Sequence, residues 1–240
     1  MVRKLAYSVS EREHWISASG GLLGILAVLW VSHVWLGGHG GVLAVASMGA
    51  SAVLLFAAPH GALSQPWPVF GGNLVSAVIG VACQNWLGAE PMLAASVAVA
   101  LAIAAMYTLR CLHPPGGATA LYAVLGGETV HALGYGYVFS PVLLNVVVLL
   151  AVAVAFNAPL AWRRYPQSWH RRSQGQAKAE PAEESMIPHS NLVYALSQID
   201  TFVDVSEEDL QRIYALAMGH HSPAVDAVAR AAVPVAEPAG

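Results

Sequence analysis

The chain has 240 residues, of which 56% are hydrophobic and 10% are charged, and its formal net charge is −3. A soluble domain carries about 25% charged residues, so this composition excludes an ordinary soluble core. Between Glu13 and Arg163 the formally charged residues are Glu90, Arg110 and Glu128. This pattern predicts an all-α, polytopic membrane helix bundle in contact with the lipid bilayer. No basic stripe with interleaved aromatic residues is present, which argues against nucleic acid as a partner.

Five apolar runs are long enough to span a bilayer, at roughly 17–25 residues each. Glycine- and proline-containing turns separate them, so neighbouring spans are expected to be antiparallel. The predicted spans are 17–36, 40–58, 71–88, 91–109 and 137–156.

Basic residues near the span ends predict that both termini are cytoplasmic. Five crossings cannot satisfy that prediction, because an odd number places the termini on opposite sides. A sixth, broken crossing is therefore predicted at 113–134, with a re-entrant segment as the alternative. The bases that set this orientation are Arg3, Lys4, Arg12, Arg163, Arg164, Arg171 and Arg172.

A weak internal repeat agrees with six crossings. The segment 48–54, Met-Gly-Ala-Ser-Ala-Val-Leu, is similar to the segment 116–122, Gly-Gly-Ala-Thr-Ala-Leu-Tyr. In the six-crossing arrangement these copies lie in crossings two and five and run in opposite directions. That is typical of two three-helix halves with inverted topology.

The expected domain organisation follows from changes in composition along the chain. It comprises a cytoplasmic N-terminal segment (1–16), a transmembrane domain (17–160), a polar linker (161–189), a cytoplasmic helical segment (190–220) and a disordered tail (221–240).

The strongest functional signal is the run from Arg110 to Thr119, Arg-Cys-Leu-His-Pro-Pro-Gly-Gly-Ala-Thr. Proline is favoured at the first position of a helix, so a helix is predicted to begin at Pro114-Pro115 and to run to Leu125. A helix N-terminus attracts anions, and glycine amides approach a ligand closely. The candidate substrate-binding residues here are Arg110, His113, Pro114, Pro115, Gly116, Gly117, Ala118 and Thr119.

Each of these residues also has a structural interpretation. Arg110 is a common kind of anchor at a span end, His113 can cap the backbone, and the Pro-Pro-Gly-Gly run can form a kink. Further candidates within the spans are Gly49, Ser51, Asn73 and Asn145, for which interhelical hydrogen bonding is the alternative to lining a pathway.

No catalytic signature is found, so an enzyme is not expected. The two cysteines, Cys83 and Cys111, lack metal-ligand spacing, and so do the scattered histidines His33, His39, His60 and His131. Neither a metal nor a cofactor is predicted.

The run from His113 to Ala118 resembles the signature of the HPP family of integral membrane proteins, and the chain looks like a bacterial-type member, which implies a bacterial inner membrane. Segments 47–56 and 62–66, and Gly71-Gly72-Asn73, are also similar to that family, and the resemblance covers about residues 17–164. It implies transport, with nitrite as the substrate attributed to plastid and cyanobacterial relatives. The family is commonly described with four membrane helices, whereas the charge argument gives six crossings.

The predicted function is therefore a transporter or channel-like permease for a small inorganic anion, with nitrite as the first candidate. The small number of spans suggests a homo-oligomer. Two alternatives are a membrane sensor that signals through its cytoplasmic helices, and a proton or cation pathway.

Overall fold

The computed structural model describes residues 11–36, 45–160, 162, 163 and 165–168, together with Leu210 and Tyr214. Every regular element in this part of the chain is helical, which confirms the all-α prediction. The chain divides into two units, Met1–Ala177 and Lys178–Gly240, and the bundle described below belongs to the first. Most of the predicted linker (161–189) and helical segment (190–220), and the whole predicted tail (221–240), lie outside the described residues.

The elements follow one another with short connections. They are α1 (Glu11–Leu36), α2 (Val45–Ala57), the 3-10 turn η1 (Ala62–Ser64), α3 (Pro66–Leu87), α4 (Pro91–Thr108), α5 (Pro115–Leu125), α6 (Glu128–His131), the π-helical segment η2 (Val138–Leu143) and α7 (Leu144–Asn157).

Four helical stretches of the described chain are long and apolar enough to cross a membrane. They are Glu11–Trp35, Pro66–Leu87, Pro91–Thr108 and Val138–Asn157. Large apolar side chains point outward from these stretches, among them Leu22, Leu26, Val78, Leu101 and Val147. An outer surface of this kind suits lipid rather than water, so the structure agrees with a multi-pass membrane domain.

The two remaining helices, α2 and α5, are shorter than a membrane span. They have 13 and 11 residues, or about 20 and 16 Å at 1.5 Å per residue, against a hydrocarbon core of about 30 Å. The element at the Pro-Pro-Gly-Gly motif is therefore a broken one, as predicted. Six crossings remain a prediction, because α2 and α5 are too short to span the core alone.

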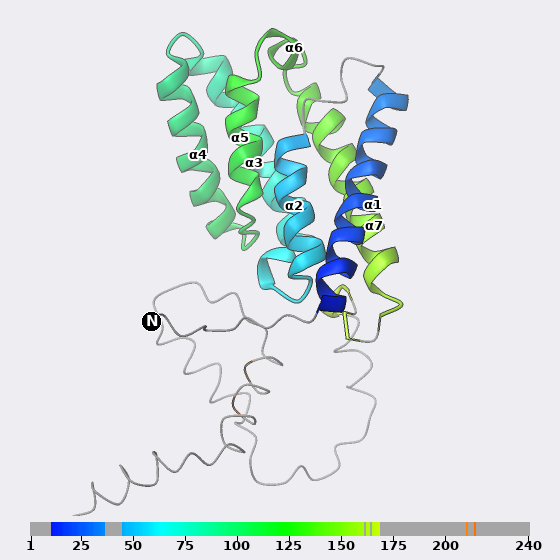
Figure 1. The fold of residues 1–240 in the computed structure, drawn as a ribbon. Coiled ribbons are helices and arrows are strands. Elements are labelled where there is room, and N and C mark those ends of the chain that lie inside the picture. The colour runs from blue at the N-terminus through cyan, green and yellow to red at the C-terminus, as the bar shows by residue number, and fades with distance from the viewer. Residues whose placement is uncertain are drawn as a thin grey trace, which may run out of the picture. The chain divides into compact units, whose positions relative to one another are not determined.

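Helix directions alternate through the bundle. Figure 1 shows α1, α3 and α5 running one way and α2, α4 and α7 running the other. The order is long, short, long in α1–α3 and again in α4, α5 and the stretch η2–α7, with the directions reversed. This arrangement agrees with the inverted repeat predicted from the sequence.

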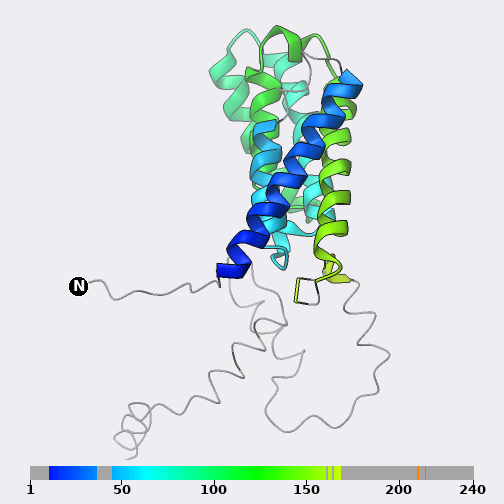
Figure 2. The ribbon, with the colours of Figure 1, turned by 45° about the vertical axis from the view of Figure 1, so that its right-hand side comes forward.

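The first helix of the bundle begins close to where the last helix ends. Figures 1 and 2 show that α1 begins and α7 ends at the same end of the bundle. Contacts agree, because Trp162 Nε1 donates to Glu13 Oε2 at 3.1 Å and the Arg12 guanidinium lies 4.8 Å from the centre of the Trp162 ring. The prediction that both ends share one side of the membrane fits this geometry.

Three predicted boundaries were wrong. Helix α1 begins at Glu11, six residues before the predicted start at 17. Helix α3 begins at Pro66, five residues before the predicted start, because Pro66 and Pro68 occupy its first turn, where a missing N–H leaves no hydrogen bond unmade. The last span does not form one regular helix from Tyr137 onward. Its backbone breaks at Ser140, whose φ and ψ are −140° and 108°, next to Pro141.

Two clusters of packing hold the bundle together. In the first, the Phe56 ring of α2 lies against α1 and α7 and contacts the Phe156 ring edge to face, 5.7 Å between centres. A Cβ at Gly20 would come within 2.5 Å of Phe56. Glycine at this position therefore lets α1 lie directly on the aromatic pair.

In the second cluster, α3, α4 and α5 pack against one another with small residues at the contacts. A Cβ at Gly80 would lie 2.6 Å from the Ala120 carbonyl oxygen, and one at Gly116 would lie 2.7 Å from the Gly72 carbonyl oxygen. Small residues at such contacts allow close backbone approach, which is how membrane helices gain packing energy without a hydrophobic driving force. The small buried residues of α4 at this contact are Ala94, Ala95, Ala98 and Ala102.

Candidate functional site

The connection between α4 and α5 folds back against the first turns of α3. Arg110 has φ = 52°, in the left-handed region, which turns the chain after α4. The Cys111 amide donates to the Met106 carbonyl at 2.9 Å, and Trp67 Nε1 donates to the Leu109 carbonyl at 3.2 Å. These bonds satisfy carbonyls at the end of α4, and they carry the chain inward toward His113.

His113 is fully buried and both of its ring nitrogens have partners. Nδ1 lies 2.9 Å from the Leu63 carbonyl oxygen, and Nε2 lies 2.8 Å from Ser51 Oγ. A carbonyl can only accept, so Nδ1 carries the proton, and in the neutral ring Nε2 accepts from the Ser51 hydroxyl. The imidazole therefore links α2, the η1 turn and the start of α5.

A second buried polar contact lies one turn into α5. The Thr119 hydroxyl donates to Asn73 Oδ1 at 2.7 Å, and Asn73 Nδ2 donates to the Val69 carbonyl at 2.9 Å. The Tyr137 hydroxyl donates to the Thr119 carbonyl at 3.2 Å. These hydrogen bonds join α3, α5 and Tyr137, the residue that precedes η2. Asn73, Thr119 and Tyr137 are all fully buried.

Ser51 and Thr119 hold equivalent positions in the two copies of the repeat, since 48–54 aligns with 116–122. Both hydroxyls are fully buried and both bond a side chain from another element. The two short helices also contact each other. The sequence repeat therefore corresponds to a pair of facing half-length helices with matched polar groups.

The amides at the start of α5 are engaged within the turn. Gly116 N donates to the His113 carbonyl at 2.8 Å and Gly117 N donates to the Pro114 carbonyl at 3.0 Å. The two glycines otherwise differ, because a Cβ at Gly116 meets Gly72 and Ser76, whereas one at Gly117 meets nothing within 4 Å. Pro115 is buried, while Pro114 and Ala118 are exposed, so Gly117 and Ala118 lie on the open side of this helix end.

Three candidate residues lie apart from the buried hydrogen bonds of His113 and Thr119. Arg110 is exposed and has no ion-pair partner among the described residues. Asn145 bonds to α1, where Ser32 Oγ donates to its Oδ1 at 2.6 Å, and its Nδ2 has no partner within the described chain. Gly49 lines a groove between α1 and α2.

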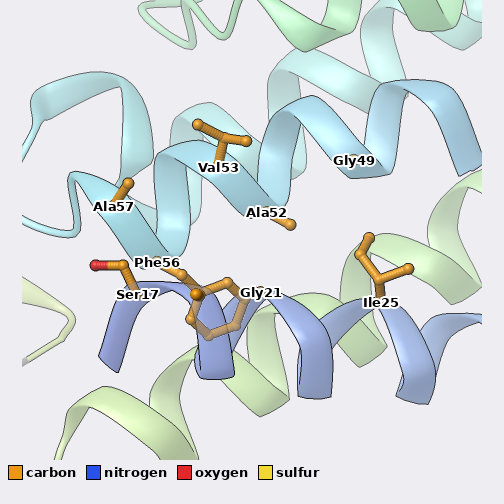
Figure 3. Close-up of a pocket in the computed structure, with 9 residues that line it drawn as sticks. Ser17, Gly21, Ile25, Gly49, Ala52, Val53, Phe56 and Ala57 are labelled. Atoms are coloured by element: carbon orange, nitrogen blue, oxygen red, sulfur yellow. The ribbon is translucent and has the colours of Figure 1, made fainter. Parts of the chain in front are cut away.

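That groove has a volume of about 320 Å³ and an almost wholly apolar lining. Figure 3 shows Gly49 and Ala52 on α2 facing Gly21 and Ile25 on α1, with Phe56 at its floor. Ser51 is two residues from Gly49, on a different face of α2, and bonds His113 instead. Gly49 therefore belongs to the surface between α1 and α2.

Four groups escaped the sequence analysis. Three of them make buried hydrogen bonds, namely the Leu63 carbonyl, Tyr137 and Ser32. The fourth, Ser76, is buried and has no hydrogen-bond partner in the described structure. Only Ser76 carried a signal, because Asn73 and Ser76 are one turn apart and fall on the same helix face. A backbone carbonyl such as that of Leu63 gives no signal at all.

No group of three or more histidine, cysteine or acidic residues that could hold a metal ion occurs in the described part of the chain. The polar set at His113 consists instead of hydroxyls, amides and one imidazole. Such groups bind small polar or ionic solutes through hydrogen bonds.

Comparison with known proteins adds an independent line of observation. The sequence matches the family described as "HPP, transmembrane region" over residues 6–166. The chain belongs to the HPP family. The matched region contains the whole helix bundle and the His113 contacts, so the resemblance noted from the motif is confirmed.

Two transmembrane proteins of Dictyostelium discoideum are also similar to this HPP protein. They are 37% identical over 131 and 128 residues, which cover 53% and 52% of this chain. The matches span 42% and 45% of those longer proteins. No solved structure matches the sequence.

Proposed function

We propose that this HPP protein is a membrane permease for a small inorganic anion, with nitrite as the first substrate to test. The observation that carries the proposal is the buried polar contact between Ser51 of the half-length helix α2 and His113, which lies just before the half-length helix α5. Half-length helices flanked by full spans are the usual setting for solute sites in transporters. Polar and ionisable residues at membrane depth mark substrate or ion pathways.

Charge near the start of α5 favours an anion. The helix N-terminus contributes about half a positive charge, and Arg110 is the formal charge nearest to it along the chain. We place the anion on the open side of the α5 start, beside Gly117, where Arg110 provides attraction.

Movement of the broken elements supplies a route for alternating access. Helix α5 and the segment η2 are joined through Tyr137 and Thr119, and the backbone of η2 breaks at Ser140. In this proposal the α3–α4–α5 cluster moves against the α1–α2–α7 cluster and exposes the site to each side in turn. Two or more copies of the chain forming a homo-oligomer remain part of the proposal.

A proton pathway is the second candidate, and the Ser51–His113 hydrogen bond favours it. A hydroxyl bonded to an imidazole can pass a proton when the ring turns or titrates. This pathway predicts proton flux without nitrite, lost in His113→Gln and retained in Arg110→Ala.

Nitrite uptake into proteoliposomes tests the main proposal. Wild-type protein should take up nitrite, and Arg110→Ala should raise the KM about fivefold, as expected for one exposed charge worth about 1 kcal/mol. The matched control is Arg12→Ala, which removes an exposed arginine at the same end of the bundle but away from α5. Its KM should stay at the wild-type value.

A second variant tests access at α5. A Cβ at Gly117 meets no atom within 4 Å, so Gly117→Leu adds bulk at the helix start without disturbing the packing against α3. Combined with Arg110→Ala it should abolish uptake. Unchanged uptake by the double variant, or none by the wild type, would reject the anion proposal.

A further inference from the structure

The chain that follows α7 is fastened to the loop between α2 and α3. Tyr165 is buried, and its hydroxyl donates to the Ser64 carbonyl at 2.7 Å. Gln167 donates from its backbone N to Gln65 Oε1 at 3.1 Å and from Nε2 to the His60 carbonyl at 2.7 Å. His60 Nε2 in turn donates to the Trp162 carbonyl at 2.9 Å. We call residues 162, 163 and 165–168 the strap.

The same loop holds His113. The Leu63 carbonyl that accepts from His113 Nδ1 and the Ser64 carbonyl that accepts from Tyr165 belong to consecutive residues of the η1 turn. Ser64 Oγ ties this turn down further, with bonds to the Leu54 carbonyl at 3.1 Å and the Ala58 carbonyl at 2.7 Å. One short 3-10 turn therefore receives a hydrogen bond from the strap and another from the imidazole.

We propose that Tyr165 is a positioning residue for His113, and that the strap couples the chain after α7 to the site between α2 and α5. This inference rests on the function proposed above for that site. Displacing the strap frees the Ser64 carbonyl, loosens the η1 turn and lets the Leu63 carbonyl move away from Nδ1. His113 then loses the bond that fixes its tautomer and orientation.

The coupling depends on where the strap lies and not on the protonation of Tyr165. Burial raises the pKa of the Tyr165 phenol, so the hydroxyl stays protonated and donates to Ser64 across the physiological range. The bond breaks when the strap moves.

The test observes His113 directly, apart from transport. Protein labelled with ¹⁵N at its ten histidines is placed in lipid nanodiscs, and the His113 ring signal is assigned by its loss in His113→Gln. We expect the Nδ1–H tautomer in the wild type. Tyr165→Phe keeps the ring but removes the hydroxyl, and should speed Nδ1–H exchange with water about fivefold, the effect of one neutral hydrogen bond.

Tyr107→Phe is the matched control, because Tyr107 is exposed on α4, and it should leave His113 exchange unchanged. Gln167→Ala removes the side-chain bond to His60 and should shift exchange in the same direction as Tyr165→Phe. If Tyr165→Phe fails to fold, Gln167→Ala replaces it in the experiment. Wild-type exchange at His113 in both folded variants overturns the proposal.

Nitrite uptake by the same preparations separates this inference from the proposed function. Altered His113 exchange in Tyr165→Phe, in a protein whose wild type takes up no nitrite, supports the positioning role and rejects the anion permease. Normal nitrite uptake with unaltered His113 exchange supports the anion permease and rejects the positioning role. If both proposals hold, Tyr165→Phe changes the pH profile of uptake, and that change disappears in the His113→Gln background.

Discussion

Arg163 and Glu13 form an ion pair across 150 positions of sequence, where the end of α7 lies beside the start of α1. The guanidinium is almost fully buried, at 1% exposed, and also contacts Ser17, Asn157 and the Phe56 carbonyl. Burial lowers the pKa of Arg163, and Glu13 opposes that shift. One side chain thus fastens α1, α2 and α7 together at the end of the bundle.

Removing the carboxylate of Glu13 should destabilise the bundle. Breaking a fully buried pair costs about 3–5 kcal/mol, but a quarter of Glu13 is exposed, so we expect about 2 kcal/mol for Glu13→Gln. At about 2–4 °C per kcal/mol, the Tm in detergent should fall by roughly 6 °C. Glu11→Gln, in the same turn but exposed, is the control and should leave the Tm within about 1 °C. Equal Tm values for the two variants would contradict the fastening role.

Neighbouring glycines in α5 should respond in opposite directions to alanine. At Gly116 the new Cβ would lie 2.7 Å from the Gly72 carbonyl oxygen, and such overpacking costs about 1–3 kcal/mol. At Gly117 nothing is met, and alanine favours the helix by up to about 1 kcal/mol. Thermal unfolding should therefore give a lower Tm for Gly116→Ala and an unchanged or higher one for Gly117→Ala. A Tm for Gly116→Ala at or above that of Gly117→Ala would mean that α5 does not lie this close to α3.

Thr119→Val should leave Asn73 Oδ1 without its donor in a buried position. An unsatisfied buried acceptor costs about 1–3 kcal/mol, whereas Thr119→Ser keeps the hydroxyl and should cost less. Thr108→Val serves as the control, because Thr108 is exposed and bonds only the Ala104 carbonyl of its own helix. In detergent, Thr119→Val should have a lower free energy of unfolding than either Thr119→Ser or Thr108→Val. A Thr119→Val protein as stable as Thr108→Val would exclude a stabilising role for the Asn73–Thr119 bond.

Residues 12 and 128 should be reached from opposite sides of the membrane. Figure 1 places the start of α1 and the helix α6 at opposite ends of the bundle, and both Arg12 and Glu128 are exposed. In intact cells an impermeant maleimide should label Glu128→Cys, and label Arg12→Cys only after permeabilisation. The native thiols, Cys83 and Cys111, are buried and should give little background. Labelling of both variants from one side would refute cytoplasmic termini with residue 128 outside.

Local patterns predicted the helices well, for reasons that need no tertiary contact. Pro114-Pro115 fixes the start of α5 because proline suits the first helical turn, and the structure begins the helix at Pro115. Four of the five predicted apolar runs correspond to the spanning stretches, whereas the described part of 40–58 forms the shorter helix α2. The same preference of proline for the first helical turn holds at Pro66 and Pro68. Interpreting these prolines as part of a turn placed the predicted start of α3 too late.

The partners of the candidate residues were beyond such patterns. Ser51 and Gly49 lie two positions apart, yet one bonds His113 and the other lines the groove between α1 and α2. Arg163 served the sequence analysis only as a sign of orientation, although it forms the buried ion pair with Glu13.

The sequence by itself determined the class of the protein, its family and the broken helix at His113. These follow from composition, from a motif, and from the backbone preferences of proline and glycine. Only the tertiary structure decided which polar groups meet. Those contacts depend on how helices distant in the chain pack, and the partners include carbonyls such as that of Leu63, which every residue carries and no sequence pattern distinguishes.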